Sequence, residues 1–163
     1  MTARTYTACA DWLSRTPIRA CCFRLLFRLL PIVTAVAYLS CAAFLLWKGH
    51  LISIQFLVVP ALTFLGVTLL RQWLNFPRPY DQLEYVPFLS AEPGKGKSFP
   101  SRHTASAAAI ALAFCQLSPA LGSGFWILAV MVAASRVVGG AHYIRDVLAG
   151  LFLPLLFLPL YLL

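Results

Sequence analysis

Five long apolar runs are the feature that most constrains how this chain can fold. They lie at residues 31–47, 51–70, 104–121, 125–138 and 147–163, with short connections except for the long polar stretch 71–103. A transmembrane helix needs about 20 predominantly apolar residues, so the four longer runs approach the length that crosses a bilayer. The 163 residues are 61% hydrophobic and only 11% charged, as in membrane proteins and unlike soluble domains. We therefore expect an all-α, polytopic bundle of about five transmembrane helices.

The first 30 residues differ from these runs because they carry many cations. The arginines recur at about one helical turn, with Leu, Phe and Trp between them: Arg15, Arg19, Arg24 and Arg28. This pattern favours a basic amphipathic helix that lies in the membrane interface, with its cations among the lipid headgroups. The alternative is that the segment is the basic flank of the first span and crosses with it. We expect an interfacial segment at 1–30 and a membrane-embedded domain at 31–163.

The polar residues gather on one side of the membrane if all five runs cross it. The N-terminus, residues 71–103 and the interruption at 136–146 then share one face, whereas the short turn SPALGSG at 118–124 lies on the other. Ionisable groups at membrane depth are energetically expensive. Their concentration near the span ends of one face therefore predicts a functional site there.

Two polar clusters contain arginines that can meet an anion. Arg71 and Arg78 are seven residues apart in RQWLNFPRP, so on a helix they would share a face. In PSRH, the residues Ser101, Arg102 and His103 stand where the next span begins. Free backbone N–H groups and the positive end of the dipole make a helix start a seat for anions.

A third cluster, SRVVGGAHYIRD, follows the fourth span. Arg136 ends that span, and the two glycines at 139 and 140 allow the chain to turn. His142 and Asp146 are four residues apart, so on a helix they would share a face. The carboxylate can then accept a hydrogen bond from one imidazole nitrogen, which makes the other nitrogen a better base or nucleophile.

Together these groups favour phosphoryl transfer. Guanidinium groups match the nonbridging oxygens of a phosphoryl group and the charge that they carry in the transition state. One histidine can attack phosphorus while the other protonates the leaving oxygen. We therefore expect a phosphohistidine intermediate. We expect no metal, because the clustered arginines would repel a metal cation.

The three clusters resemble the signature motifs of the type-2 phosphatidic acid phosphatase and haloperoxidase superfamily. The family pattern is Lys-x6-Arg-Pro, then Pro-Ser-Gly-His, then Ser-Arg-x5-His-x3-Asp. This chain reads Arg71-x6-Arg78-Pro79, Pro100-Ser101-Arg102-His103 and Ser135-Arg136-x5-His142-x3-Asp146, in the same order. The resemblance covers about residues 51–160.

The resemblance implies a role for each matching residue. His142 would be the nucleophile, Asp146 its orienting partner and His103 the general acid for the departing lipid alcohol. Phosphate oxygens would be held by the arginines and by the start of the helix: Arg71, Arg78, Arg136, and Ser101 with the amides of 101–103. The resemblance implies no metal and no other cofactor.

Two residues depart from the family pattern. Arg71 replaces the usual lysine, which keeps the charge and adds a planar fork. Arg102 replaces the usual glycine. Arg102 is either a further phosphate-binding residue or a side chain that points outward to a headgroup, a diphosphate or solvent. We favour the outward orientation, because a glycine in relatives implies that only the backbone faces phosphate.

The predicted function is hydrolysis of a lipid phosphomonoester or diphosphate of the phosphatidic acid, phosphatidylglycerophosphate or polyprenyl class. One alternative is a lipid phosphotransferase with the same site, and another is a non-catalytic binder of anionic lipid. We expect membrane lipids as partners and no nucleic acid, and the sequence indicates no oligomeric state.

The N-terminal arginines also predict an orientation. By the positive-inside rule they favour a cytoplasmic N-terminus, here in a bacterial inner membrane. With five spans, the site then faces the cytoplasm as well. The alternative is an N-terminus and a site on the outer face, against the charge rule.

Overall fold

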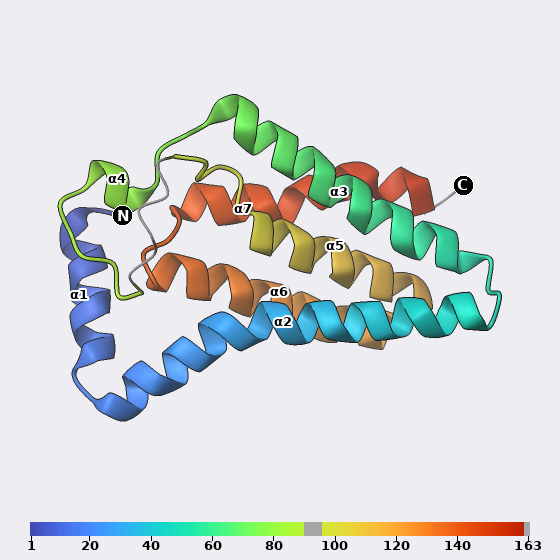
Figure 1. Ribbon diagram of the computed structural model, residues 1–163, viewed down its shortest axis with the longest axis horizontal. Helices are drawn as coiled ribbons and strands as arrows, with labels where there is room; N and C mark the ends of the chain where they lie inside the picture. The colour runs from blue at the N-terminus through green and yellow to red at the C-terminus, as the bar shows by residue number, and fades with distance from the viewer. Residues whose placement is uncertain (90–95, 162–163) are drawn as a thin grey trace.

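The computed structural model describes residues 1–89 and 96–161, most of which are helical. In chain order the elements are α1 (Ala3–Ser14), α2 (Pro17–Trp47), α3 (Ile52–Leu74), α4 (Pro79–Gln82), α5 (Arg102–Leu117), α6 (Pro119–Val138), α7 (Ile144–Phe152) and the 3₁₀ helix η1 (Leu153–Tyr161). The long helices pack along one another as a bundle, and α1 lies across one end of it (Figure 1). No strand occurs in the described ranges, and the expected all-α fold is confirmed.

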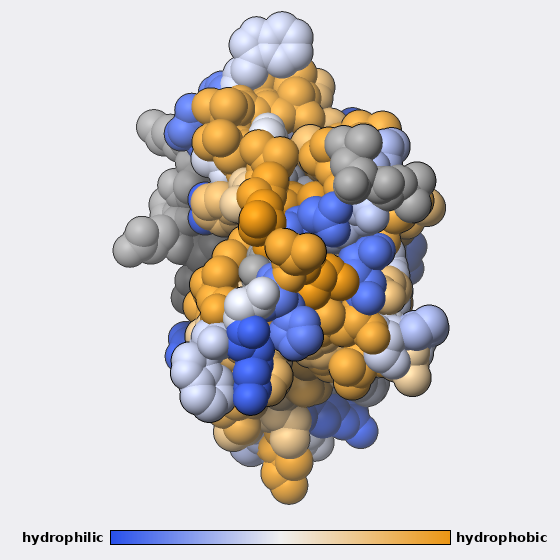
Figure 2. All heavy atoms as spheres, turned by 90° about the vertical axis from the view of Figure 1, so that its right-hand side faces the viewer, coloured by the Kyte–Doolittle hydropathy of each residue, from blue (hydrophilic) through white to orange (hydrophobic). Residues whose placement is uncertain are grey.

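Within the described part of the chain, four helical segments are long and apolar enough to cross a membrane: Pro17–Trp47, Ile54–Gln82, Pro119–Val138 and Ile144–Tyr161. Only 22–33% of each apolar window is buried inside the protein. Large side chains such as Val36, Leu39 and Leu65 are exposed along α2 and α3. Apolar surface also covers much of the end where α2 turns into α3 (Figure 2). Lipid tails match such a surface and water does not, so this is a multi-pass membrane protein.

The remaining expected span, α5, forms the centre of the bundle. It contacts α2, α3, α6, α7 and η1, and almost all its residues from Thr104 to Phe114 are buried. Its alanines let the neighbouring helices approach closely. Phe114 stacks on Phe125 of α6 with ring centroids 3.8 Å apart and meets Phe56 of α3 edge-on at 5.4 Å. This helix is therefore surrounded mainly by protein, which explains its small side chains.

The basic N-terminal segment is divided differently from the expectation. After the separate helix α1, α2 runs without a break from Pro17 to Trp47 and contains Pro31. The Thr16 side chain caps its start by accepting a hydrogen bond from the Arg19 N–H at 3.4 Å. A helix of 31 residues extends about 46 Å, beyond the ~30 Å hydrocarbon core, so its basic first turns continue the span into the headgroups. Residue 30 is not a helix boundary, and a division of the chain there stays a prediction.

The chain reverses between α5 and α6 at a single residue, Ser118, and the turn expected through residue 124 is wrong. Pro119 already occupies the first turn of α6. Gly122 continues the helix because it packs against α5, where an added Cβ would lie 2.8 Å from the Cα of Cys115. Ser, Pro and Gly favour turns in general. Here the glycine instead provides a close helix contact that no local pattern reveals.

We expect Gly122→Ala to destabilise the protein by about 1–3 kcal/mol, because the methyl group must push α6 away from the Cys115 backbone. Gly124→Ala is the matched control, since a Cβ there meets nothing within 4 Å. Thermal unfolding in detergent, followed by circular dichroism, should give a lower midpoint for Gly122→Ala only. Equal midpoints for the two variants would contradict the close packing of α5 and α6.

Candidate active site

A cavity of about 210 Å³ lies at the end of the bundle where α3 and α6 end and α5 begins. Its lining comes from several elements: Phe27, Arg71, Arg78, Arg102, His103, Arg136, Ala141 and His142. The structure therefore brings together all the candidate site residues except Ser101 and Asp146, which lie behind the cavity wall and are fully buried. None of the described lining residues is acidic. We call this space the catalytic cavity.

The spacing of His142 and Asp146 had predicted that both lie on a helix. The structure instead places His142 in the turn between α6 and α7. Its Nδ1 is nevertheless 3.5 Å from Oδ2 of Asp146, in the first turn of α7. Burial lowers the pKa of His142 below its ordinary range, although the Asp146 carboxylate opposes this shift. The imidazole is therefore neutral at neutral pH. With Nδ1 turned to the carboxylate, Nε2 is the nitrogen that keeps a free lone pair.

The Asp146 carboxylate is held by groups that the sequence did not reveal. Its Oδ2 accepts hydrogen bonds from the Ser98 hydroxyl and, at 3.0 Å, from the Tyr143 N–H. The same Ser98 Oγ is 3.4 Å from Nδ1 of His142. Ser98 belongs to none of the predicted motifs, and a serine in a polar loop carries no spacing signal. It completes the support of the carboxylate that orients the histidine.

Ser101 is the N-cap residue of α5, as predicted, but it does not line the cavity. Its N–H donates a hydrogen bond to the Asp146 carbonyl at 2.9 Å, and its Oγ lies 2.9 Å from Oγ1 of Thr104. The expectation that the Ser101 amide is free for an anion is therefore wrong in this structure. A phosphate contact of the Ser101 hydroxyl stays a prediction.

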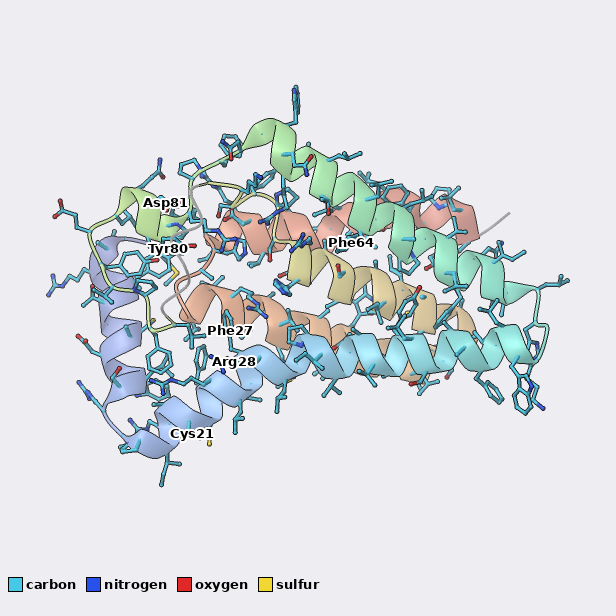
Figure 3. All side chains as sticks on the ribbon, viewed as in Figure 1. Cys21, Phe27, Arg28, Phe64, Tyr80 and Asp81 are labelled. Carbon is cyan, nitrogen blue, oxygen red and sulfur yellow. The ribbon has the colours of Figure 1, made fainter. Side chains whose placement is uncertain are left out.

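Neutral groups rather than carboxylates hold the arginines of the cavity. Arg71 Nη1 donates to two carbonyls of the segment before α5, at 2.7 and 3.3 Å. Arg136 donates to the Phe27 carbonyl at 2.9 Å, and its guanidinium lies 3.7 Å from the centre of the Phe27 ring. The side chain of Phe27 lies on the side of α2 that faces α6 (Figure 3). The Nε atoms of Arg78 and Arg136 are buried without a hydrogen-bond partner, so these side chains retain unused capacity for an anion.

Arg78 reaches the cavity by a different route from the predicted one. The helix that carries Arg71 ends at Leu74, and Asn75 adopts the left-handed conformation with φ 42°. Arg78 lies beyond this point, immediately before α4. The two arginines therefore do not share a helical face, but the turn at Asn75 returns Arg78 to the same cavity.

Two stacked tyrosines hold the turn that carries His142. Tyr6 of α1 is buried, and its hydroxyl donates to the His142 carbonyl at 3.2 Å. Its ring stacks on Tyr85 with centroids 4.9 Å apart, and the Tyr85 hydroxyl donates to the Gly140 carbonyl at 2.6 Å. Burial raises the pKa of Tyr6 to about 12, so it remains a donor at physiological pH. Neither tyrosine belongs to a predicted motif, and only the structure places them here.

The chain is similar to curated phosphatases over part of their length. A lipid A 1-phosphatase of Rhizobium etli is 34% identical over 88 residues, which cover 51% of this chain and 37% of that protein. An Escherichia coli protein with the provisional name undecaprenyl-diphosphatase YbjG is 34% identical over 113 residues, which cover 67% of this chain and 57% of that protein. The chain therefore spans less than two thirds of either relative.

Two solved structures share the fold. The crystal structure of LpxE from Aquifex aeolicus matches 99% of this chain and 94% of that one, with a TM-score of 0.73 and 21% identity. The crystal structure of a phosphatidylglycerolphosphate phosphatase of the PAP2 type from Bacillus subtilis matches 97% of this chain and 83% of that one, with a TM-score of 0.64 and 22% identity. The model of the PAP2 superfamily matches residues 52–163, the part of the chain that contains all three motifs. The chain belongs to the PAP2 superfamily.

Proposed function

We propose that this protein is a membrane lipid phosphatase that acts through a phosphohistidine at His142. The observation that carries the proposal is the catalytic cavity itself, where a neutral, carboxylate-braced histidine lies with His103 and a set of arginines, and where none of the described lining residues is acidic. The names of the relatives from R. etli and E. coli support a phosphorylated lipid as the substrate. The substrate class is a lipid phosphomonoester or diphosphate of the phosphatidic acid, phosphatidylglycerophosphate or polyprenyl type.

The reaction proceeds in two displacements at phosphorus. Nε2 of His142 attacks, the bond from phosphorus to the lipid oxygen breaks, and that oxygen takes a proton from His103. The negative charge of the bound phosphate stabilises the cationic form of His103, which burial and the neighbouring arginines oppose in the empty cavity. Asp146 stabilises the imidazole as its positive charge develops. Water, deprotonated by His103, then breaks the N–P bond and releases phosphate. The guanidinium groups stabilise the charge on the nonbridging oxygens in both steps, and neither step requires a metal.

We expect His142→Ala to lower kcat for phosphate release by about a thousandfold or more, because the covalent route is removed. The measurement is phosphate release from phosphatidic acid, phosphatidylglycerophosphate and a polyprenyl phosphate, with orthovanadate as an inhibitor. Unchanged turnover in His142→Ala would refute the phosphohistidine. Phosphate release that requires an added lipid acceptor would instead identify a phosphotransferase. Binding of the lipids without any turnover would identify a non-catalytic binder.

The hydrogen bond from Tyr6 to the His142 carbonyl predicts that α1 supports catalysis, because it holds His142 in place. We expect Tyr6→Phe to lower kcat roughly 2- to 10-fold with little change in KM, because one hydrogen bond of about 0.5–1.5 kcal/mol no longer holds the turn. Tyr38→Phe is the matched control. Its hydroxyl donates to the Phe56 carbonyl at 3.1 Å, and its ring stacks on Phe56, outside the site. Equal kcat values for the two variants would contradict a positioning role for Tyr6.

The contact between Tyr6 and the His142 turn also places the N-terminus at the end of the bundle that contains the site (Figure 1). We propose that this end faces the cytoplasm of a bacterial inner membrane, because the arginines of α1 and the start of α2 obey the positive-inside rule there.

This orientation is testable with single cysteines at Thr2 and Lys97 in a background that lacks the five native cysteines. We expect a membrane-impermeant thiol reagent to label neither position in intact cells and both after permeabilisation. Labelling of both in intact cells would place the site outside. Labelling of only one would contradict their common face.

A further inference from the structure

Arg102 stands where three cavities meet. Its side chain is exposed at the start of α5, with the guanidinium carbon 5.5 Å from the centre of the Phe64 ring. Phe64 lies on the side of α3 that faces α5 (Figure 3). Besides the catalytic cavity, Arg102 lines a cavity of about 260 Å³ with mostly apolar walls, the apolar cavity, and one of about 350 Å³, the basic cavity. This position allows both orientations considered from the sequence, toward phosphate in the catalytic cavity and outward from it, so the outward orientation stays a prediction.

The basic cavity is lined by the Thr68 hydroxyl, the Gln72 amide and four cationic side chains. The cations are Arg71, Arg78, Lys97 and Arg102. The arginines among them also line the catalytic cavity, so the two spaces share one set of guanidinium groups. None of the described residues that line the basic cavity is acidic. Like charges at such short range repel one another, and an anion among them removes this cost.

Among the described residues, the Asp81 carboxylate lies near this cavity, but backbone groups use it. Oδ2 of Asp81 accepts hydrogen bonds from the N–H groups of Arg78 and Gly96 at 3.0 and 3.1 Å. It therefore fixes the loop and does not pair with a guanidinium in these contacts. Neither His103 nor His142 lines the basic cavity. The cavity can hold a phosphate, but among its described lining residues there is no histidine that could attack or protonate one.

We propose that the basic cavity binds the second phosphate of a lipid diphosphate, a proposal that rests on the phosphatase function above. The terminal phosphate lies in the catalytic cavity against His142, and the phosphate bonded to the lipid lies beside Arg102 and Lys97. The lipid chain enters the apolar cavity between α2, α3 and α5, whose polar mouth is formed by Arg102 and His103. Arg102 thus selects the substrate at the position where the family pattern Pro-Ser-Gly-His has glycine.

The bond changes agree with this placement. Nε2 of His142 bonds to the terminal phosphorus, and the bond from that phosphorus to the bridging oxygen breaks. The electron pair goes to the bridging oxygen, which leaves as part of a lipid monophosphate. Water then cleaves the N–P bond and releases inorganic phosphate. A phosphate monoester has a second pKa of about 6, so the leaving group carries negative charge that Arg102 and Lys97 stabilise.

Farnesyl diphosphate and farnesyl monophosphate test the proposal because they differ only in the second phosphate. We expect the wild type to prefer the diphosphate in kcat/KM by about tenfold or more, as one charge-assisted contact predicts. Lys97→Gly removes a cation while suiting the left-handed backbone of that residue, with φ 58°. Lys97→Gly and Arg102→Gly should each reduce the preference about tenfold, mainly through KM for the diphosphate.

Arg28→Ala is the control, because it removes a cation from α2 that lines none of the three cavities, and it should keep the preference. Wild-type turnover without preference for the diphosphate would overturn the proposal. So would equal losses on both substrates in Lys97→Gly and Arg102→Gly, which would show general attraction of anions. Absence of turnover of either substrate by the wild type, with binding intact, would instead overturn the phosphatase function.

Discussion

The buried carboxylate of Asp146 is the interaction on which the site depends. A charge with no exposure to solvent is tolerated only if hydrogen bonds and an opposite or polarisable partner compensate it. Here the compensation comes from the Ser98 hydroxyl, the Tyr143 N–H and the imidazole of His142, all at Oδ2. At Oδ1 it comes from the Arg145 guanidinium, whose Nε is 3.6 Å away. The Asp146 carbonyl in addition accepts the N–H of Ser101. One residue therefore joins the loop before α5, the start of α5 and the turn before α7, and it sets the tautomer of His142.

The arginines follow the opposite principle, because no carboxylate neutralises them inside the catalytic cavity. Carbonyl groups and the Phe27 ring orient Arg71 and Arg136 without cancelling their charge. Two buried Nε atoms, of Arg78 and Arg136, have no partner. Such a cavity is electrostatically incomplete on its own, which favours an anionic ligand and, in a low dielectric, the more highly charged transition state. The basic cavity beside it is also lined by cations, with no acidic residue among its described lining, so it favours an anion for the same reason.

The N-terminal helix α1 connects the membrane surface to this chemistry. It lies across the end of the bundle outside the range that the family model matches, yet its Tyr6 contacts the turn of His142. Tyr85 contributes the second half of the stacked pair from the loop after α4. Together the two rings fix a turn that contains adjacent glycines and would otherwise be free to move. Helix α1 is thus part of the support of the turn that carries His142.

The sequence alone determined the all-α membrane class, the approximate spans and most of the residues of the catalytic cavity, because hydrophobic run length and motif spacing are local properties. It misplaced features that depend on contacts between distant segments. The spacing of His142 and Asp146 predicted their contact correctly but on the wrong backbone, since a turn at Gly140 replaces the helix there. Ser98 and Tyr6 carry no signal in the sequence, because their partners lie more than 40 residues away. Only tertiary packing decided which hydroxyls reach the buried Asp146 and the His142 turn, and that Arg102 faces three cavities at once.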